Sequence, residues 1–341
     1  MKTLITGASG YIGNALSHSL KSKGKDFLGV DSGAREQWVT EVGGKSLTEY
    51  PTIPFLFCNV AMKNDLVNVL QYYRPDTIVH LASQPSGPYS QLNYDKRIFT
   101  QQNNLLMLLN LLAISKEMGL DCKFIVTTTT GVPGAPGEPI VEDHMPNLAG
   151  SCYHISRGFD SANLSLAARQ WKMRLLEIRT SIVYGTRING INEPITRLDW
   201  DFCFGTAIHR FILRKKLGLP ITIYGKGLQM KPIISLRDTI ESLEKAIESD
   251  IPIGHEIMNQ TTQCVSVVKM AEEVGGEITH IPNPRVEKED YQMTIHNQKF
   301  LKLLPNYDSK RNQLFEEVHQ IENDMDLNLL PINWLTSYEG K

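Results

Sequence analysis

Several classes of protein are excluded by what this chain of 341 residues has little of. It has five cysteines, an odd number with no Cys-x-x-Cys spacing, so neither a disulfide framework nor a metal site is indicated. The formal net charge of −2 gives no field that would attract nucleic acid or an anionic membrane. The longest apolar stretch, Leu105–Ile114, is about half of the roughly 20 residues that a membrane span needs. The chain also reaches glycines too early for a signal peptide, so we expect a soluble protein of the cytoplasm.

Short β-rich runs alternate with helical stretches in the first half of the chain. The strand candidates are Lys2–Thr6, Phe27–Asp31, Phe55–Cys58, Thr77–Leu81, Lys123–Thr128 and Leu175–Val183. Strands that alternate with helices form βαβ units and therefore a parallel sheet. The pattern predicts an α/β fold in which a Rossmann-type doubly wound parallel sheet carries a smaller α/β C-terminal lobe for the substrate.

The pattern changes after Gly185, where a loop-rich segment begins. A helix near 205–217 and a strand at Ile221–Tyr224 follow, and residues 232–248 indicate a return to the first domain. We therefore predict a Rossmann domain made of residues 1–185 and 229–260. Residues 186–228 and 261–341 would form the smaller lobe.

Two helical stretches carry more apolar surface than one face of a sheet can bury. They are Asn104–Met118, which is rich in leucine, and Tyr153–Trp171. A helix that is apolar all round is buried all round. We expect these helices to form the interface of a homodimer; the alternative is that a long loop covers them.

The start of the chain carries a glycine motif, Gly7-Ala8-Ser9-Gly10-Tyr11-Ile12-Gly13, between a predicted strand and a predicted helix. In such a motif the first glycine makes a tight turn, the second lets the backbone approach a pyrophosphate, and the third lets helix and strand pack closely. The helix N-terminus then faces the phosphate charge. Asp31 ends the second strand 18 residues after Gly13, where an acidic residue meets the adenosine ribose. The motif predicts a dinucleotide site.

Asp31 favours NAD over NADP, because its carboxylate would repel a 2′-phosphate. Arg35 lies four residues later and keeps NADP open as the alternative, since a guanidinium would attract that phosphate. Asn59 and Val60 follow the third strand and are placed to touch the adenine. An ordinary turn at the end of a strand would explain these two residues equally well.

Tyr153 and Arg157 lie four residues apart, so on a helix they share one face. Thr129 ends a predicted strand, which is where α/β sites collect their catalytic groups. A tyrosine can take the proton of a hydroxyl while hydride leaves the same carbon for NAD. Its ordinary pKa near 10 is too high for this task, so an adjacent cation must lower it. The three residues therefore predict a hydride-transfer site.

These features resemble the extended short-chain dehydrogenase/reductase superfamily over nearly the whole chain, with Arg157 in place of the lysine of its Tyr-x-x-x-Lys motif. A closer resemblance is to the UDP-sulfoquinovose synthase family. The runs that carry it are Gln84–Ser90, Thr100–Asn104, Tyr153–Ser156, Phe204–Ala207, Tyr224–Gly227, Ile234–Thr239 and Asn283–Glu287.

The resemblance implies an enzyme that joins UDP-glucose and sulfite with bound NAD. Oxidation at C4 would make the C5 proton acidic, the 6-hydroxyl would leave, sulfite would add at C6, and the hydride would return to C4. Thr129 and Tyr153 would serve hydride transfer, aided by Arg157. His154 would be a proton shuttle, or else a histidine that packs on the cofactor.

The resemblance also implies two sets of binding residues. The cofactor would lie against Gly7, Gly10, Tyr11, Ile12, Gly13, Asp31, Asn59, Val60, Leu81, Ala82, Ser83, Asn104, Tyr153 and Arg157. The substrate would lie against Gln84, Thr129, Thr206, Tyr224, Gln229, Lys231, Arg285 and Glu287. In the second set, Tyr224 would pack on the uracil, Lys231 and Arg285 would neutralise the diphosphate, and Glu287 would take ribose hydroxyls.

The chain departs from this family at three positions near the chemistry: Arg157 replaces lysine, Val132 replaces a glutamate and Pro85 replaces an arginine. Lys231 also stands where the family tends to have arginine, which exchanges a bidentate grip for a point charge. Two alternatives therefore stay open. One is a UDP-glucose 4-epimerase or dehydratase, since epimerisation does not need an acid at position 132. The other is a protein that binds NAD and a nucleotide sugar with weakened catalysis.

Overall fold

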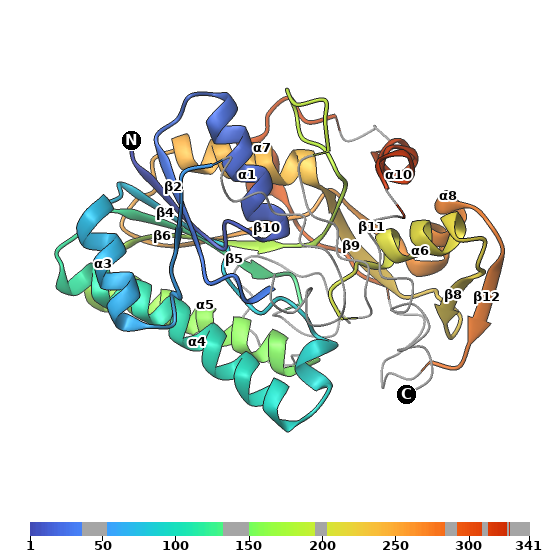
Figure 1. Ribbon diagram of the computed structural model, residues 1–341, viewed down its shortest axis with the longest axis horizontal. Coiled ribbons are helices and arrows are strands. Elements are labelled where there is room, and N and C mark those ends of the chain that lie inside the picture. Colours follow the sequence, from blue (N-terminus) through green and yellow to red (C-terminus); the bar gives the residue numbers. More distant parts are fainter. Residues whose placement is uncertain are drawn as a thin grey trace.

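The computed structural model describes residues 1–35, 53–131, 150–194, 203–283, 292–308, 313–325 and 327. Within these residues the chain forms a large sheet with helices on both faces and a smaller lobe at one end (Figure 1). The lobe lies at the right of that view.

In the described part of the chain the large sheet has seven strands, and every pair of neighbours is parallel. The strands are β1 (Thr3–Thr6), β2 (Phe27–Asp31), β3 (Phe55–Phe57), β4 (Thr77–His80), β5 (Lys123–Thr129), β6 (Arg174–Thr180) and β10 (Gly254–Gln260). Their order, β10-β6-β5-β4-β1-β2-β3, runs outward from β1 in both directions. This order is that of a doubly wound Rossmann fold, so the predicted fold class is confirmed.

Helices cover the two faces of this sheet and bury a separate apolar core on each. One face carries α3 (Lys63–Tyr73), α4 (Tyr94–Glu117) and α5 (Cys152–Trp171), whose leucines join the core below them. The other face carries α1 (Tyr11–Ser22), α7 (Leu236–Glu248) and α9 (Gln298–Leu303). A parallel sheet needs this cover on both sides, because its strands are apolar on both faces.

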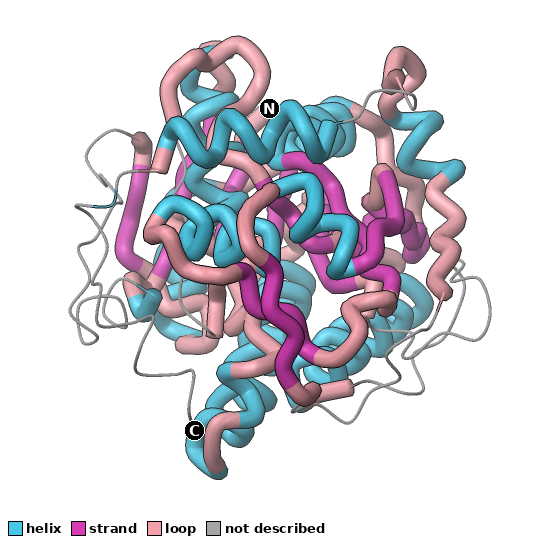
Figure 2. The backbone as a smooth tube through the Cα atoms, turned by 90° about the vertical axis from the view of Figure 1, so that its right-hand side faces the viewer, coloured by secondary structure: helices cyan, strands magenta, loops and turns pink. Residues whose placement is uncertain are grey.

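The smaller lobe contains two short sheets within the described residues. One joins β7 (Ile182–Tyr184), β9 (Met230–Ser235) and β11 (Gln263–Ser266), and the other joins β8 (Ile221–Tyr224) and β12 (Ile278–Ile281). Helices α6 (Ala207–Lys216), α8 (Val267–Val274) and α10 (Gln313–Asp324) pack with them around a third apolar core. Figure 2 views the molecule from this end. The helix and the strand predicted for this segment are both present.

The structure differs from the sequence prediction in how the chain passes between the two parts. The single strand predicted at Leu175–Val183 is two strands, because the chain leaves the large sheet at Ser181 and pairs β7 with β9 instead. Strand β9 therefore belongs to the lobe, and of the predicted segment 229–260 it is α7 and β10 that return to the large sheet. Helix α9, predicted in the lobe, packs on β10 and α7 because Phe300 is fully buried in the large core.

Helices α4 and α5 lie side by side along the lower edge of Figure 1. In a single chain, the outer surface of these two helices exposes large apolar side chains to solvent. The exposed residues that do not line the cavity are Tyr94, Ile98, Leu106, Ile155, Phe159 and Leu166. We call this set the α4/α5 face. No helix in the described part of the chain is long and apolar enough to cross a membrane.

Candidate active site

A cavity of about 1440 Å³ opens at the carboxyl ends of β1, β4 and β5 and extends to the smaller lobe. The strand order reverses between β1 and β4, and ligands of open α/β sheets bind at such a reversal. The turn after β1 and the loop after β4 meet there, since Leu81 N donates to Thr6 O at 3.1 Å. Pockets for one small ligand measure about 300–1,000 Å³. This cavity therefore has room for a dinucleotide and a second ligand.

The glycine motif forms the turn between β1 and α1 and lines the cavity. Gly7 has a positive φ of 77°, and a Cβ there would lie 2.6 Å from the backbone nitrogen of Ala82. A Cβ on Gly13 would lie 2.0 Å from Gly7 O, so only glycine lets the helix start this close to the turn. The first turn of α1 thereby presents its backbone amides to the cavity, as a pyrophosphate requires.

Asp31 is held at the end of β2 by two backbone amides. Its Oδ2 accepts from Ser9 N at 3.2 Å and its Oδ1 accepts from Gly33 N at 2.9 Å. The carboxylate is thus fixed against the glycine turn and lines the cavity, where the hydroxyls of an adenosine ribose would reach it. Arg35 also lines the cavity, and its guanidinium lies 3.8 Å from the ring centroid of Phe204.

Most of the residues predicted to bind the cofactor line this cavity. They are Gly7, Gly10, Tyr11, Ile12, Gly13, Asp31, Asn59, Val60, Leu81, Ala82, Ser83, Tyr153 and Arg157. Asn104 is different, because it is fully buried and does not line the cavity in the described part of the chain. Its Oδ1 accepts from Gln84 N at 2.7 Å, and its Nδ2 donates to Gln84 O and to Ser156 Oγ. Asn104 therefore holds the loop after β4 against α5.

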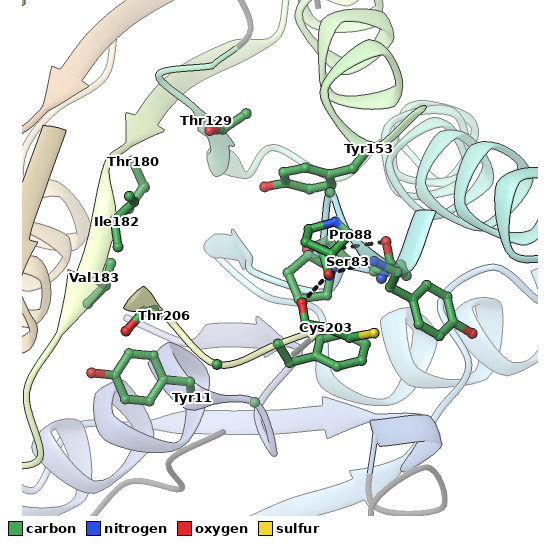
Figure 3. Close-up of a pocket in the computed structure, with 18 of the residues that line it drawn as sticks. Tyr11, Ser83, Pro88, Thr129, Tyr153, Thr180, Ile182, Val183, Cys203 and Thr206 are labelled. Carbon is green, nitrogen blue, oxygen red and sulfur yellow. Dashed lines mark hydrogen bonds between the residues drawn. The ribbon is translucent and has the colours of Figure 1, made fainter. Parts of the chain in front are cut away.

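Thr129 and Tyr153 face the cavity from β5 and from the first turn of α5 (Figure 3). Burial raises the pKa of the Tyr153 phenol above its ordinary value, the charge of Arg157 and a hydrogen bond with Thr129 lower it, and the Asp160 carboxyl raises it. The Thr129 hydroxyl also accepts from Gly131 N at 3.2 Å, which fixes its rotamer. The pair can bind one substrate hydroxyl between them, and the cation needed by the tyrosine is in place.

Arg157 lies one turn after Tyr153 and is only 2% exposed. Its Nη1 is 2.8 Å from Oδ2 of Asp160, and its Nη2 donates to the carbonyl of Thr127. Burial raises the pKa of the Asp160 carboxyl to about 7, although the guanidinium lowers it. Arg157 therefore places its charge beside Tyr153, while its Nη1 and Nη2 are turned toward Asp160 and Thr127.

His154 is packed into the rim of the cavity between two glycines. A Cβ on Gly131 would lie 2.5 Å from its Cδ2, and a Cβ on Gly87 would lie 3.7 Å from its Cε1. Its Nδ1 lies 2.8 Å from the hydroxyl of Ser151, the residue that precedes α5. Burial and the charge of Lys231 lower the pKa of the imidazole to about 4, so His154 is neutral near pH 7.

The residues predicted to bind the substrate come from both parts of the molecule. Those in the described residues all line the cavity, and they are Gln84, Thr129, Thr206, Tyr224, Gln229 and Lys231. Thr206 caps α6 through its hydroxyl, which accepts from His209 N. Arg285, Glu287 and the departure at Val132 lie outside the described residues. Pro85 lines the cavity and brings no charge to it.

Sequence reasoning missed the residues that roof the cavity. Cys203 lies on a loop that crosses to the loop after β4 (Figure 3), and Phe204, the next residue, also lines the cavity. The hydroxyl of Ser86 donates to Cys203 O, and the ring centroids of Tyr89 and Phe204 are 5.4 Å apart. Ser86 and Cys203 are 117 residues apart in the chain, so no local pattern joins them. Ser151 was also missed, although a serine just before a helix is a common cap.

Residues 3–259 match the NAD dependent epimerase/dehydratase family. The chain belongs to this family. Its cofactor is NAD, in agreement with the glycine turn and Asp31. When bound, NAD supplies the acceptor and the donor of a hydride, and Thr129 and Tyr153 line the cavity in which that chemistry would take place.

Two curated members of the epimerase/dehydratase family show how far the similarity extends. The chloroplastic UDP-sulfoquinovose synthase of Spinacia oleracea is 30% identical over 343 residues, which cover 89% of this chain and 71% of that one. The UDP-sulfoquinovose synthase of Sulfolobus acidocaldarius is 30% identical over 352 residues, which cover 91% and 89%. The resemblance to these proteins that the sequence runs predicted is confirmed.

A solved structure gives the same fold. UDP-glucuronic acid 4-epimerase from Bacillus cereus, in complex with UDP-glucuronic acid and NAD, superimposes with a TM-score of 0.74. It is 22% identical, and the match covers 95% of this chain and 98% of that one. At this identity the comparison supports the architecture of the epimerase/dehydratase family and not a particular substrate.

Proposed function

We propose that this protein makes UDP-sulfoquinovose from UDP-glucose and sulfite. The observation that carries the proposal is the placement of Thr129, Tyr153 and His154 on one wall of a cavity with room for two ligands. The 30% identity to two UDP-sulfoquinovose synthases over about nine-tenths of the chain favours this reaction within the family.

In the proposed reaction Tyr153 takes the proton of the sugar's 4-hydroxyl as hydride leaves C4, and Thr129 holds the same oxygen. The new ketone acidifies the C5 proton, and loss of that proton with the 6-hydroxyl releases water. The sulfur of sulfite then bonds to C6 while C5 takes up a proton, and return of the hydride and of the proton from Tyr153 restores the 4-hydroxyl. Carbon 4 is oxidised and then reduced, so no external oxidant is consumed.

The other side chains divide between the two ends of the substrate. We assign His154 to the C6 end, because it lies beside Tyr153, with the two ring centroids 5.1 Å apart. Lys231 and Tyr224 would hold the diphosphate and the uracil from the smaller lobe, and both line the cavity. Arg285 and Glu287 would complete this grip. A lysine binds a diphosphate as a point charge, so we expect weaker orientation here than an arginine gives.

We also propose that the protein is a homodimer built on the α4/α5 face. Leu106 and Phe159 are 44% and 48% exposed within one chain, on two helices that lie side by side. Contiguous apolar surface of this kind usually marks an interface. A second copy presenting the same face would bury it symmetrically.

A UDP-hexose 4-epimerase is the second candidate. Thr129 and Tyr153 suffice for oxidation and re-reduction at C4, and Pro85 leaves one wall of the cavity without a charge. An epimerase needs the 4-keto sugar to rotate in the site between the two hydride transfers, so that hydride returns to the other face of C4. The synthase needs sulfite instead.

Incubation of the protein with UDP-glucose, with and without sulfite, separates the two candidates when the products are identified by mass. We expect a sulfonated UDP-sugar only when sulfite is present. Tyr153→Phe is the control and should form no product under either condition. A UDP-hexose of unchanged mass but changed configuration, formed without sulfite, would identify an epimerase instead.

A further inference from the structure

Ser151 makes two contacts with His154, and together they define which nitrogen of the imidazole carries the proton. The Ser151 hydroxyl accepts a hydrogen bond from the backbone nitrogen of His154 at 3.3 Å, as the N-cap of α5. The same oxygen lies 2.8 Å from Nδ1 of the His154 ring. Ser151 is 7% exposed, so its hydroxyl is largely shielded from water.

The direction of the second hydrogen bond follows from the inventory of donors. A serine hydroxyl has one hydrogen and two lone pairs. One lone pair is used by the cap, and no other acceptor for the hydrogen is present within the described part of the chain. The hydroxyl therefore donates to Nδ1. A neutral imidazole that accepts at Nδ1 carries its proton on Nε2.

We propose that Ser151 is a positioning residue that fixes His154 as the Nε2–H tautomer, so that His154 meets the substrate as a neutral hydrogen-bond donor. The His154 ring is held in one orientation because it packs between Gly131 and Gly87. The fit is close, since a Cβ on Gly131 would collide with the ring. The inference rests on the proposed function, since it takes His154 to contact the sugar.

The tautomer decides what His154 does. An imidazole with its proton on Nε2 cannot remove a proton through that nitrogen, but it can stabilise negative charge that develops on a substrate oxygen. A neutral histidine near a helix N-terminus is known to act as such a donor in other enzymes. His154 lies in the first turn of α5, where the helix dipole disfavours a positive charge, and burial acts in the same direction.

Three substitutions of Ser151 separate its effect on the tautomer of His154 from its role as the N-cap of α5. Ser151→Thr keeps both the cap and the hydroxyl hydrogen. Ser151→Asp keeps the cap, but a carboxylate only accepts, so it would draw the proton onto Nδ1. Ser151→Gly still serves as a cap and costs only a few tenths of a kcal/mol at such positions, while it leaves Nδ1 without a donor.

The direct readout is nitrogen NMR of the protein, labelled with ¹⁵N in its histidine rings, with His154→Gln used to assign the resonance. We expect an unprotonated Nδ1 and a protonated Nε2 in the parent and in Ser151→Thr, the reverse in Ser151→Asp, and a mixture in Ser151→Gly. A protonated Nδ1 in the parent would overturn the proposal, and so would an unchanged tautomer in Ser151→Asp.

The kinetic readout uses UDP-glucose and sulfite. We expect Ser151→Asp to lower kcat by about 100-fold with little change in KM for UDP-glucose, since a misplaced donor acts on the transition state. Ser151→Thr should restore kcat to within a few-fold of the parent. If the parent forms no sulfonated product, the proposed function fails, and the NMR measurement still decides the tautomer. If the tautomer reverses in Ser151→Asp and kcat is unchanged, the proposal that the Nε2–H of His154 donates to the substrate is wrong.

Discussion

Arg157 and Asp160 form an ion pair at 2.8 Å, one turn apart on α5, and neither side chain is more than 2% exposed. The pair stands where short-chain dehydrogenases carry a lysine. A guanidinium is too large and too strongly charged to be buried alone, and Asp160 together with the carbonyl of Thr127 supplies its partners. Arg157 is thereby held beside Tyr153 as a positive charge that lowers the pKa of its phenol, while Asp160 offsets part of this effect.

Replacement of Arg157 by methionine should destabilise the protein, because it leaves the Asp160 carboxylate buried without a counter-charge. We expect a loss of roughly 3–5 kcal/mol in the free energy of unfolding. The loss should grow between about pH 7 and pH 9. The pKa of the Asp160 carboxyl is about 7 in the folded parent and should be higher without the guanidinium, so above pH 7 the parent can ionise this carboxyl while the variant must keep it protonated or bury an uncompensated charge.

Urea unfolding across this pH range measures the effect, and Arg157→Met combined with Asp160→Leu is the control. The double variant removes both charges and should recover much of the lost stability. An Arg157→Met variant as stable as the parent at pH 8 would show that the pair is not a buried ion pair in solution.

Hydride transfer should depend on Tyr153 more than on any other side chain. Tyr153→Phe removes the hydroxyl that takes the proton, and we expect the single-turnover reduction of bound NAD by UDP-glucose to fall by roughly 10²–10⁴-fold. Since burial raises the pKa of Tyr153, the rate in the parent should rise with pH into the alkaline range. Arg157→Met should slow the reaction and move this profile to higher pH, whereas Arg157→Lys should hold or raise the rate.

The formation of reduced nicotinamide, followed by its absorbance, measures these rates. Thr129→Ser retains the hydroxyl beside Tyr153 and serves as the matched control. If Arg157→Met reacts as fast as the parent with an unmoved pH profile, Arg157 takes no part in the reaction. If Tyr153→Phe is also unaffected, the protein binds its ligands without this chemistry.

The contact between Arg35 and Phe204 should slow the release of NAD. It joins the loop after β2 to the roof of the cavity at 3.8 Å, and Tyr89 also packs against the Phe204 ring, with the two centroids 5.4 Å apart. The protein should purify with NAD rather than NADP. Phe204→Leu keeps an apolar side chain but removes the aromatic face, which is worth about 0.5–2 kcal/mol in a cation–π contact. We therefore expect NAD to leave roughly 2- to 30-fold faster.

Dilution of the purified protein, followed by filtration and measurement of the nucleotide retained, gives this rate. Phe204→Trp keeps an aromatic face and should retain the cofactor as the parent does. Equal rates for the leucine and tryptophan variants would show that the contact does not close over the cofactor. Recovery of NADP from the denatured parent would contradict the assignment of Asp31.

The α4/α5 face should hold two copies of the chain together. Leu106→Glu or Phe159→Glu places a charge at an exposed apolar position on this face, and either should convert a dimer into a monomer. Light scattering at micromolar concentration measures the mass. Tyr72→Glu on α3 is a matched control, because Tyr72 is 77% exposed on a different helix and its replacement should leave the dimer intact. A monomeric parent would contradict the proposal.

The sequence by itself determined the glycine turn and the spacing of the residues proposed for hydride transfer. Gly7, Gly10 and Gly13 lie within one short segment between a strand and a helix, so their spacing can be read from the sequence, although the contact of Gly7 with Ala82 cannot. Tyr153 and Arg157 lie one turn apart on a helix, and Thr129 ends a strand. The periodicity of the chain places such groups correctly.

Only the tertiary structure decided where the polar ends of the side chains point and which distant residues are in contact. Asn104 turns to Gln84 rather than to the cavity, and the guanidinium of Arg157 turns to Asp160. The break of a predicted strand at Ser181 likewise depends on the pairing of β7 with β9, about 50 residues later. Each of these choices is made by packing and hydrogen bonding between segments far apart in the chain, and a local pattern carries no record of its distant partner.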